Sequence, residues 1–265
     1  MTVLKTFFKS LLALPAAGFF VTTSAEAATF ASADGQFLFE NLSHAPIVSD
    51  ATATTQTLTE GFGGSVTAVS DADAIFDGAA RRAFNFVLQE AFGAGSSYFG
   101  VAEGEASILG DFAIAAGERF SFDFFGAIDL LTLADDPGES ASAQVAIEFG
   151  VFSNTADGLI ELDTFSIEGG LFTLGDDIFS IDASEGIIPG RLEVNDSSGP
   201  DLMVESFFAG VTGAYARSFD QDRLITLAEI KRGKAVVVAD VPEPSSVIAL
   251  LVLLLPAALR RKQAA

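Results

Sequence analysis

Apolar and polar residues alternate with a period of two along much of this chain, and phenylalanine fills many of the apolar positions. The clearest stretches are Phe120–Phe124 and Ala141–Phe149. Such alternation is typical of strands that bury one face, because successive side chains of a strand point to opposite sides of a sheet. The same pattern predicts strands at residues 66–71, 83–86, 111–114, 171–174, 178–181 and 202–207. The sequence therefore predicts an all-β protein.

Segments rich in glycine, aspartate and proline separate these stretches. We expect turns at residues 61–64, 93–95, 116–118, 135–138, 156–158, 169–170 and 198–200. Many short strands with close turns favour a β-sandwich of jelly-roll-like type, flanked by an N-terminal signal helix and a short C-terminal transmembrane helix. The threonine-rich residues 51–59 are predicted as a polar strand or an ordered surface segment. Residues 220–231 fit a helix or a strand, and the apolar residues 236–238 beyond them favour a final strand pair.

Composition narrows the functional classes. The net charge of the 265-residue chain is −22, and no Lys or Arg occurs between Arg119 and Arg191. Such a surface repels phosphate backbones, so we expect no nucleic-acid partner. There is no cysteine, which removes disulfides, thiol catalysis and thiolate metal sites. His44 is the one histidine, and no Gly-x-Ser-x-Gly motif accompanies it, so we expect no enzyme of the serine-hydrolase type.

The N-terminus has the features of a secretory signal peptide. Lys5 and Lys9 precede an apolar stretch, and small residues then lead to an A-x-A site formed by Ala25 and Ala27. Signal peptidase is the expected partner, and cleavage would follow Ala27. The mature chain is thus predicted to be exported.

The C-terminus combines a rigid tripeptide, an apolar run and a basic end. Pro242, Glu243 and Pro244 precede the apolar residues 247–259. Thirteen residues of helix span about 20 Å, less than the ~30 Å hydrocarbon core of a bilayer, which predicts a short, transient anchor. The anchor residues are Val247, Leu250, Leu251, Leu253, Leu254, Leu255 and Leu259, and the basic stop comprises Arg260, Arg261 and Lys262.

This arrangement resembles the PEP-CTERM sorting tail of Gram-negative bacteria, which exosortases recognise and cleave. Pro242–Pro244, the apolar run and the basic end match its three parts, whereas Pro256 departs from them and is expected to kink the helix. The resemblance implies a precursor held transiently in the inner membrane, cleaved by an exosortase-like enzyme and delivered to the cell surface or extracellular matrix. The body is similar to cyanobacterial cargo of this type at residues 41–46 and 117–124.

We therefore expect four segments: a signal peptide at 1–27, a β-sandwich domain at 28–233, a linker with the Pro-Glu-Pro motif at 234–246, and a membrane segment with a basic tail at 247–265. Because such tails are joined to many unrelated domains, the tail implies sorting and not activity. The leading hypothesis is a non-catalytic structural protein of the cell surface or matrix.

Two other functions stay open. Asp71, Asp73 and Asp77 are spaced so that their carboxylates could bind calcium, the hard cation that prefers oxygen ligands. The alternative function is accordingly a calcium-dependent module that binds exopolysaccharide. A secreted hydrolase with a carboxylate pair is the third hypothesis, although sugar sites commonly use Trp or Tyr and this chain has no Trp and two Tyr.

Overall fold

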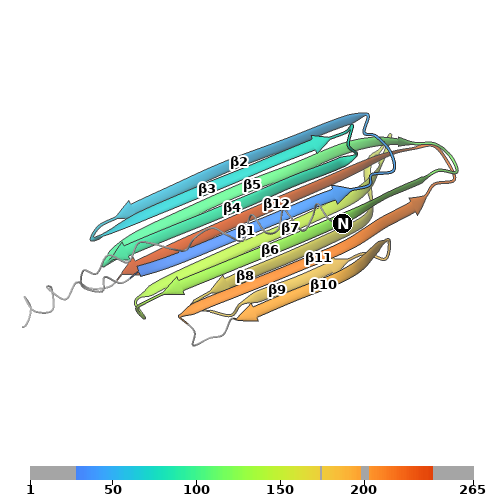
Figure 1. Cartoon of the computed structure of the whole chain (residues 1–265). Helices are drawn as coiled ribbons and strands as arrows, with labels where there is room; N and C mark the ends of the chain where they lie inside the picture. The colour runs from blue at the N-terminus through green and yellow to red at the C-terminus, as the bar shows by residue number, and fades with distance from the viewer. Residues whose placement is uncertain (1–27, 174, 198–202, 241–265) are drawn as a thin grey trace, which may run out of the picture.

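The computed structural model describes residues 28–173, 175–197 and 203–240, which form twelve β-strands and no helix. The strands lie in two six-stranded antiparallel sheets that stack with their inner faces together (Figure 1). The prediction of an all-β protein with two packed sheets is confirmed. The helices expected at both ends of the chain fall outside the described residues.

Sheet A has the strand order β10-β11-β6-β1-β4-β3, and sheet B has the order β2-β5-β12-β7-β8-β9. The strands of sheet A are β1 (Ala28–Glu40), β3 (Gly64–Asp77), β4 (Arg82–Gly95), β6 (Arg119–Ala134), β10 (Ile187–Ser197) and β11 (Val204–Ser218). Those of sheet B are β2 (Val48–Gly61), β5 (Ser97–Ile114), β7 (Glu139–Thr155), β8 (Gly158–Phe172), β9 (Ile178–Ala183) and β12 (Arg223–Asp240). Most connections cross from one sheet to the other, so strands that follow each other in sequence often face each other across the core.

The described chain begins and ends at the same end of the sandwich. Ala28 pairs with Ala94 on β4, and Asp240 pairs with Ser97 on β5, so both lie beside the β4–β5 turn (Figure 1). We call this the terminal end. The opposite end, which we call the loop end, carries the connections at residues 41–47, 78–81, 115–118 and 219–222.

Phenylalanine builds the core nearer to the loop end, which we call the aromatic core. Phe37 lies with its ring centroid 4.9 Å from that of Phe39 and 5.5 Å from that of Phe149. Phe124 of sheet A packs edge-on against Phe149 of sheet B at 5.1 Å. These rings come from the alternating stretches in the sequence, and their burial is a main source of the stability of the fold.

A second core, nearer to the terminal end, is built from small residues. Its buried members are Ala31, Ala91, Tyr98, Ala141, Ala235, Val237 and Ala239, which together we call the small-residue core. The Tyr98 ring lies where a Cβ on Gly93 would approach its Cε2 atom to 2.0 Å, so only glycine fits at that position. The two sheets are thus held together by many aromatic rings in one half and by alanine, valine and one tyrosine in the other.

Three expectations drawn from the sequence are corrected. Gly169 and Gly170 lie within β8 and not in a turn; a Cβ on Gly169 would come within 2.4 Å of the Cδ1 atom of Ile128, so the glycine lets the facing sheet approach. Residues 223–240 form the single strand β12 in place of a final strand pair. Residues 234–240 of the predicted linker therefore belong to the sandwich. The threonine-rich segment 51–59 is a strand, as predicted, within the exposed β2.

Candidate functional site

The residues predicted for sorting and processing lie outside the described part of the chain. They are Ala25, Ala27, Pro242, Glu243, Pro244, the anchor residues within 247–259, and Arg260, Arg261 and Lys262. In the described ranges, no helix has the length and apolar character needed to cross a membrane.

The predicted calcium ligands lie on or at the end of β3. Asp71 and Asp73 are exposed on the same face of the strand, and Asp73 accepts a hydrogen bond from the backbone N–H of Ala74 at 2.8 Å. Asp77 accepts the N–H of Ala80 at 2.9 Å and lies 3.8 Å from the Arg82 guanidinium. Within residues 28–173, 175–197 and 203–240, no group of three or more acidic or histidine side chains is close enough together to hold a metal ion.

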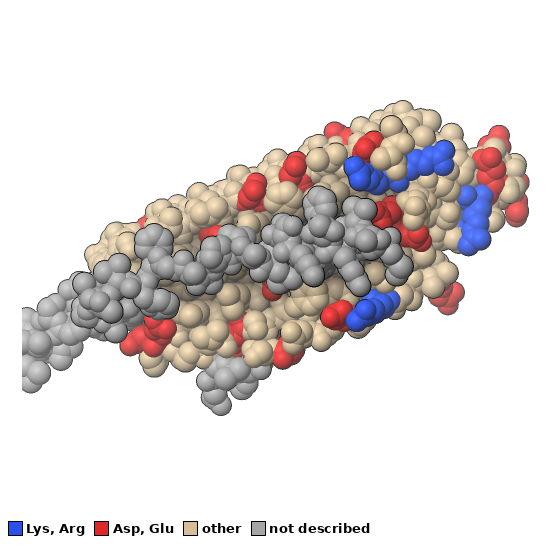
Figure 2. Space-filling model, in the orientation of Figure 1, with Lys and Arg blue, Asp and Glu red and all other residues tan. Residues whose placement is uncertain are grey.

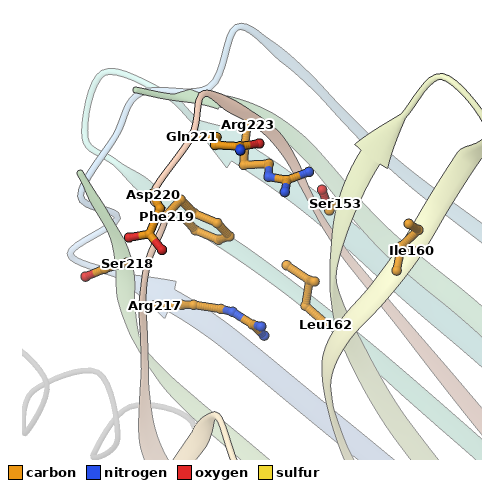
Figure 3. A pocket seen from close by; sticks show the side chains of 9 residues that line it. All are labelled: Ser153, Ile160, Leu162, Arg217, Ser218, Phe219, Asp220, Gln221 and Arg223. Carbon is orange, nitrogen blue, oxygen red and sulfur yellow. The ribbon is translucent and has the colours of Figure 1, made fainter. Parts of the chain in front are cut away.

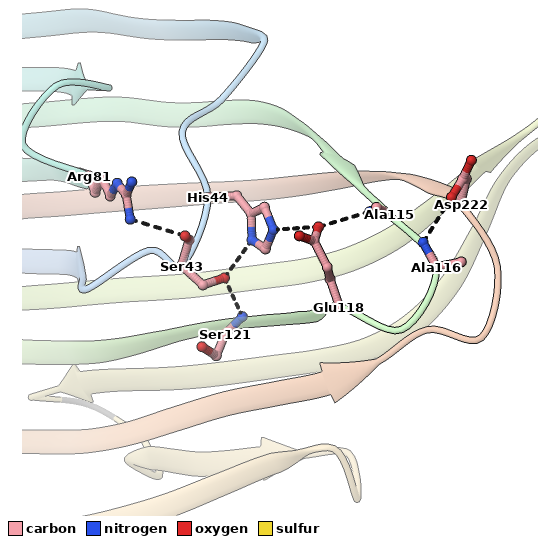
Figure 4. A network of polar contacts seen from close by, with 8 residues as sticks. All are labelled: Ser43, His44, Arg81, Ala115, Ala116, Glu118, Ser121 and Asp222. Carbon is pink, nitrogen blue, oxygen red and sulfur yellow. Dashed lines mark hydrogen bonds and ion pairs between the residues drawn. The ribbon is translucent and has the colours of Figure 1, made fainter.

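His44 belongs to a polar network at the loop end (Figure 4). Its Nδ1 atom lies 2.8 Å from the Ser43 hydroxyl and its Nε2 atom lies 3.2 Å from the Glu118 carboxylate. The Ser43 hydroxyl also accepts the N–H of Ser121 at 2.9 Å, and Glu118 accepts the N–H of Ala115 at 3.0 Å. These bonds lower the pKa of the exposed Glu118, the one from Ala115 most strongly. Ser43, His44 and Glu118 thus lie together, but the hydrogen bonds of this network connect neighbouring loops to one another.

A hollow of about 390 Å³ lies between the start of β8 and the β11–β12 connection (Figure 3). The side chains that line it are Ser153, Ile160, Leu162, Arg217, Ser218, Phe219, Asp220, Gln221 and Arg223. Arg217 is held by the buried Asp163, whose Oδ2 atom lies 3.1 Å from its Nη1 atom. Asp163 also accepts hydrogen bonds from Ser184 and from the N–H of Gly186. The hollow therefore presents a positioned guanidinium in a chain that is otherwise strongly acidic.

A buried polar contact closes the terminal end. Tyr98 donates a hydrogen bond of 2.8 Å to Oε1 of Glu139 and contacts the Thr29 hydroxyl. The other oxygen of Glu139 accepts the backbone N–H of Asp135 at 3.0 Å. Glu139 is 1% exposed, so its carboxylate depends on these donors. Burial raises the pKa of Tyr98, which keeps the phenol protonated as the donor.

The most unusual arrangement lies between the two cores, where four polar side chains are buried inside the sandwich. Asn85 and Gln89 point inward from β4 of sheet A, and Glu229 and Lys231 point inward from β12 of sheet B; we call these four residues the polar layer. Asn85, Gln89 and Lys231 are 0% exposed and Glu229 is 3% exposed. Full burial of a lysine together with a glutamate is rare, because both ions lose their hydration.

Asn85 joins the charged residues of the polar layer. The Lys231 Nζ atom donates to the Asn85 side-chain Oδ1 atom at 2.6 Å and to the backbone oxygen of Asn85 at 2.9 Å. The Asn85 Nδ2 atom donates to Oε2 of Glu229. The amide of Asn85 is thus held between an amine and a carboxyl group, with contacts on both of its polar atoms.

Burial shifts both ionisable groups toward their neutral forms. It lowers the pKa of Lys231 to about 7, although the carboxylates of Glu229 and Asp34 oppose this change. It likewise raises the pKa of Glu229 to about 7, against the opposing effects of Lys231 and Asn85. Burial therefore favours the free amine of Lys231 and the carboxylic acid of Glu229.

Glycines make room for the polar layer. A Cβ on Gly35 would lie 3.1 Å from Cδ of Lys231 and 2.7 Å from Cγ1 of Val145. A Cβ on Gly104 would lie 2.2 Å from the Nε2 atom of Gln89. Within the described residues, Oε1 of Glu229 and Oε1 of Gln89 are buried without a hydrogen-bond partner. The layer is therefore tightly enclosed but incompletely satisfied as a hydrogen-bond network.

Sequence reasoning did not single out the polar layer. The signal was present in the alternation: Ala235, Val237 and Ala239 mark the inner face of β12, and the same phase places Lys231 and Glu229 on that face. Charged residues at core positions of a strand are expected to have a specific partner. That the partner is Asn85 could not be read from the local pattern.

Comparison with protein-family models, with curated proteins and with solved structures finds no match to this chain.

Proposed function

We propose that this protein is an exported, non-catalytic structural component of the cell surface or extracellular matrix, sorted through its PEP-CTERM-like tail. The observation that carries the proposal is the position of Ala28 and Asp240 at one end of the long sandwich. A chain fastened there by its C-terminal segment would project the rest of the sandwich away from the membrane. The jelly-roll-like subtype and the terminal helices belong to this proposal as well.

The polar side-chain networks connect parts of the same domain to one another, which supports a structural role. The His44 network ties neighbouring loops, Glu139 ties the β6–β7 turn to Tyr98, and the polar layer lies between the sheets. In each case the polar groups bond to other parts of the same chain. A domain of this kind withstands the loss of its membrane anchor, as release by an exosortase-like enzyme requires.

The sorting proposal is tested by replacing Pro242, Glu243 and Pro244 with alanine in the native host. The precursor should then keep its full C-terminus and stay in the inner-membrane fraction, because the processing enzyme no longer finds its extended motif. Replacing Pro189 in β10 by alanine is the matched control and should leave processing unchanged. Normal processing and release of the triple variant would contradict the proposal.

Binding of exopolysaccharide is the second candidate function, and the hollow at the loop end favours it. Arg217 is positioned there by Asp163, and the hollow lies at the end that would point away from the membrane. Figure 2 shows that the basic side chains visible in that view gather toward one end, whereas acidic ones are more widely spread. The negative electrostatic potential of the protein should be weakest near these basic side chains, so an acidic polysaccharide would be repelled least there.

This second function is tested by pull-down with an acidic and a neutral polysaccharide, each with millimolar calcium and with EDTA. Binding of the acidic polymer that the substitution Arg217→Gln weakens at least tenfold would support the hollow as the site. Binding that needs calcium and is lost in Asp71→Asn would instead support the calcium-dependent form. If neither polysaccharide is retained, with calcium or with EDTA, the protein does not have this binding function.

A further inference from the structure

Lys231 and Asn85 are placed as two reactants. The Nζ atom of Lys231 lies 2.6 Å from Oδ1 of Asn85, and the amide carbon Cγ is bonded directly to that oxygen. A movement of the amine out of the amide plane, onto one face of the carbonyl group, would bring its nitrogen against the carbon. Holding two groups at such a distance removes most of the entropy that a bimolecular reaction between an amine and an amide must overcome.

The carboxyl group of Glu229 touches the other end of the same amide. It accepts the hydrogen bond of Asn85 Nδ2, the nitrogen that would depart if the amide were attacked. A proton carrier beside the departing atom is the arrangement that general acid catalysis requires. Gln89, the remaining member of the layer, lies beside Gly104 and donates to the backbone oxygen of Asp71, so it is not in line with the attack.

We propose that Lys231 and Asn85 form an intramolecular isopeptide bond that joins sheet B to sheet A, with Glu229 carrying the proton. The bond would connect β12 to β4 through the interior of the sandwich. No cofactor, oxidant or second chain is needed. The proposal does not depend on where the protein is sorted.

The atoms and electrons of the reaction balance within the three side chains. The lone pair of neutral Nζ forms a bond to Cγ of Asn85, and the π electrons of the carbonyl move to Oδ1. In the tetrahedral intermediate, Nδ2 of Asn85 takes a proton from the carboxylic acid of Glu229. The resulting carboxylate then takes a proton from Nζ of Lys231. The Cγ–Nδ2 bond breaks, the carbonyl is restored, and one ammonia molecule leaves.

The surroundings favour this chemistry. An amine attacks only as its free base, and a carboxyl group gives a proton only in its acid form; burial shifts Lys231 and Glu229 in these two directions. Lys231 is 0% exposed, and Gly35 packs closely against its stem, so water is kept from the new amide. The unpartnered Oε1 of Glu229 is also explained, because a group that exchanges protons during a reaction need not be fully bonded in the reactant.

Such a bond would supply a covalent cross-link to a chain that has no cysteine. The chain has no cysteine, so an exported sandwich of this length has no disulfide to hold its sheets together. Asn85 and Lys231 are 146 residues apart, so an amide between them would close most of the described domain into one covalent loop. It would tie the two sheets together between the aromatic core and the small-residue core.

The experiment is mass spectrometry of the full chain, purified under native conditions and kept at pH 7, with its ends established by peptide sequencing. The intact mass should fall below the sequence mass by about 17 Da, the mass of one ammonia molecule. Digestion should release one branched peptide that contains both Lys231 and Asn85. Native folding is checked on the same sample by circular dichroism.

Variants sharpen the assignment. Lys231→Met and Asn85→Ala should have their full sequence masses, and Glu229→Gln should fold but stay unlinked, because an amide cannot carry the proton. Lys234→Arg, on the exposed side of β12, is the matched control and should retain the loss of ammonia. Rapid linkage in Glu229→Gln would overturn the role of Glu229.

Two results from the unaltered protein overturn the bond itself, whether or not any variant folds. One is a folded chain at its full sequence mass after prolonged incubation at pH 7. The other is a loss of ammonia that peptide mapping assigns to another asparagine or to the N-terminus.

Discussion

The two halves of the sandwich interior are built differently, although they share the same strands. The aromatic core packs phenylalanines such as Phe37, Phe124 and Phe149 from both sheets. The small-residue core packs alanine and valine around Tyr98. The first half gains stability from apolar area, whereas the second brings the sheets together with little area and relies on buried polar contacts. The polar layer lies at the boundary between the two.

This difference has a consequence for stability. A half made of alanine buries few methylene groups, so it contributes less hydrophobic free energy per strand than a half made of phenylalanine. Hydrogen bonds such as Tyr98 to Glu139, and a covalent bond between Lys231 and Asn85, would fasten the weaker half. Four experiments test this comparison.

The largest effect is expected for Lys231→Met. If the isopeptide bond is present, the variant loses a loop closure of 146 residues, which should lower the free energy of unfolding by about 5 kcal/mol. Urea denaturation measures the difference. Lys234→Met on the exposed face is the control, with an expected loss below about 1 kcal/mol. Equal losses in the two variants would show that the polar layer adds no special stability.

Phe37→Ala compares the two cores directly. Removing this fully buried ring from the aromatic core should cost about 3–5 kcal/mol, because a cavity remains among the other rings. Val237→Ala in the small-residue core should cost about 2 kcal/mol, since it removes only two methyl-sized groups. Thermal unfolding followed by circular dichroism ranks the two. A reversed order would mean that the small-residue core is the more rigidly packed half.

Tyr98→Phe removes one hydroxyl from the small-residue core and leaves the ring in place. The Oε1 atom of Glu139 and the Thr29 hydroxyl lose their partner inside the protein, so we expect a loss of about 1–2 kcal/mol. Hydrogen exchange should show faster opening of the β6–β7 turn, which Glu139 holds. Unchanged exchange there would indicate that the turn is fixed by its backbone alone.

The smallest effect is expected on the outer face, at Asp34, which pairs across β1 and β6 with Asp129. Burial raises the pKa of Asp34 to about 6, and the nearby Asp129 adds to this increase. The folded state therefore favours the protonated acid, so this group's contribution to stability is complete below about pH 4 and is lost as the pH rises through 6. Asp34→Asn should remove that decline and be more stable than the parent at pH 8. A parallel pH profile for parent and variant would contradict the shift.

The two halves also differ in how far the sequence predicts them. The alternating stretches 120–124 and 141–149 are parts of β6 and β7, as predicted, because large apolar side chains mark the inner face. Strand β1 and most of β5 were not predicted. Their inward positions include Ala31, Gly35, Gly100 and Gly104, residues that carry little β-propensity and no hydrophobic signal.

Some candidate site residues can be predicted from the sequence, and others cannot. The alternation that marks Val237 as buried also places Lys231 and Glu229 on the inner face, and the sequence alone contains that information. The calcium, sorting and anchoring residues predicted from motifs stay predictions. The hollow near Arg217 and the network of His44 depend on connections that meet at the loop end from distant parts of the chain.

By itself, the sequence determined the fold class, the aromatic inner faces, most turns and the lack of any disulfide, because each follows from local period, composition or turn chemistry. Only the tertiary structure decided that residues 85 and 231 meet. Contact between facing sheets depends on how strands from both are aligned and how closely glycines such as Gly35 let them approach, and no local pattern encodes that alignment.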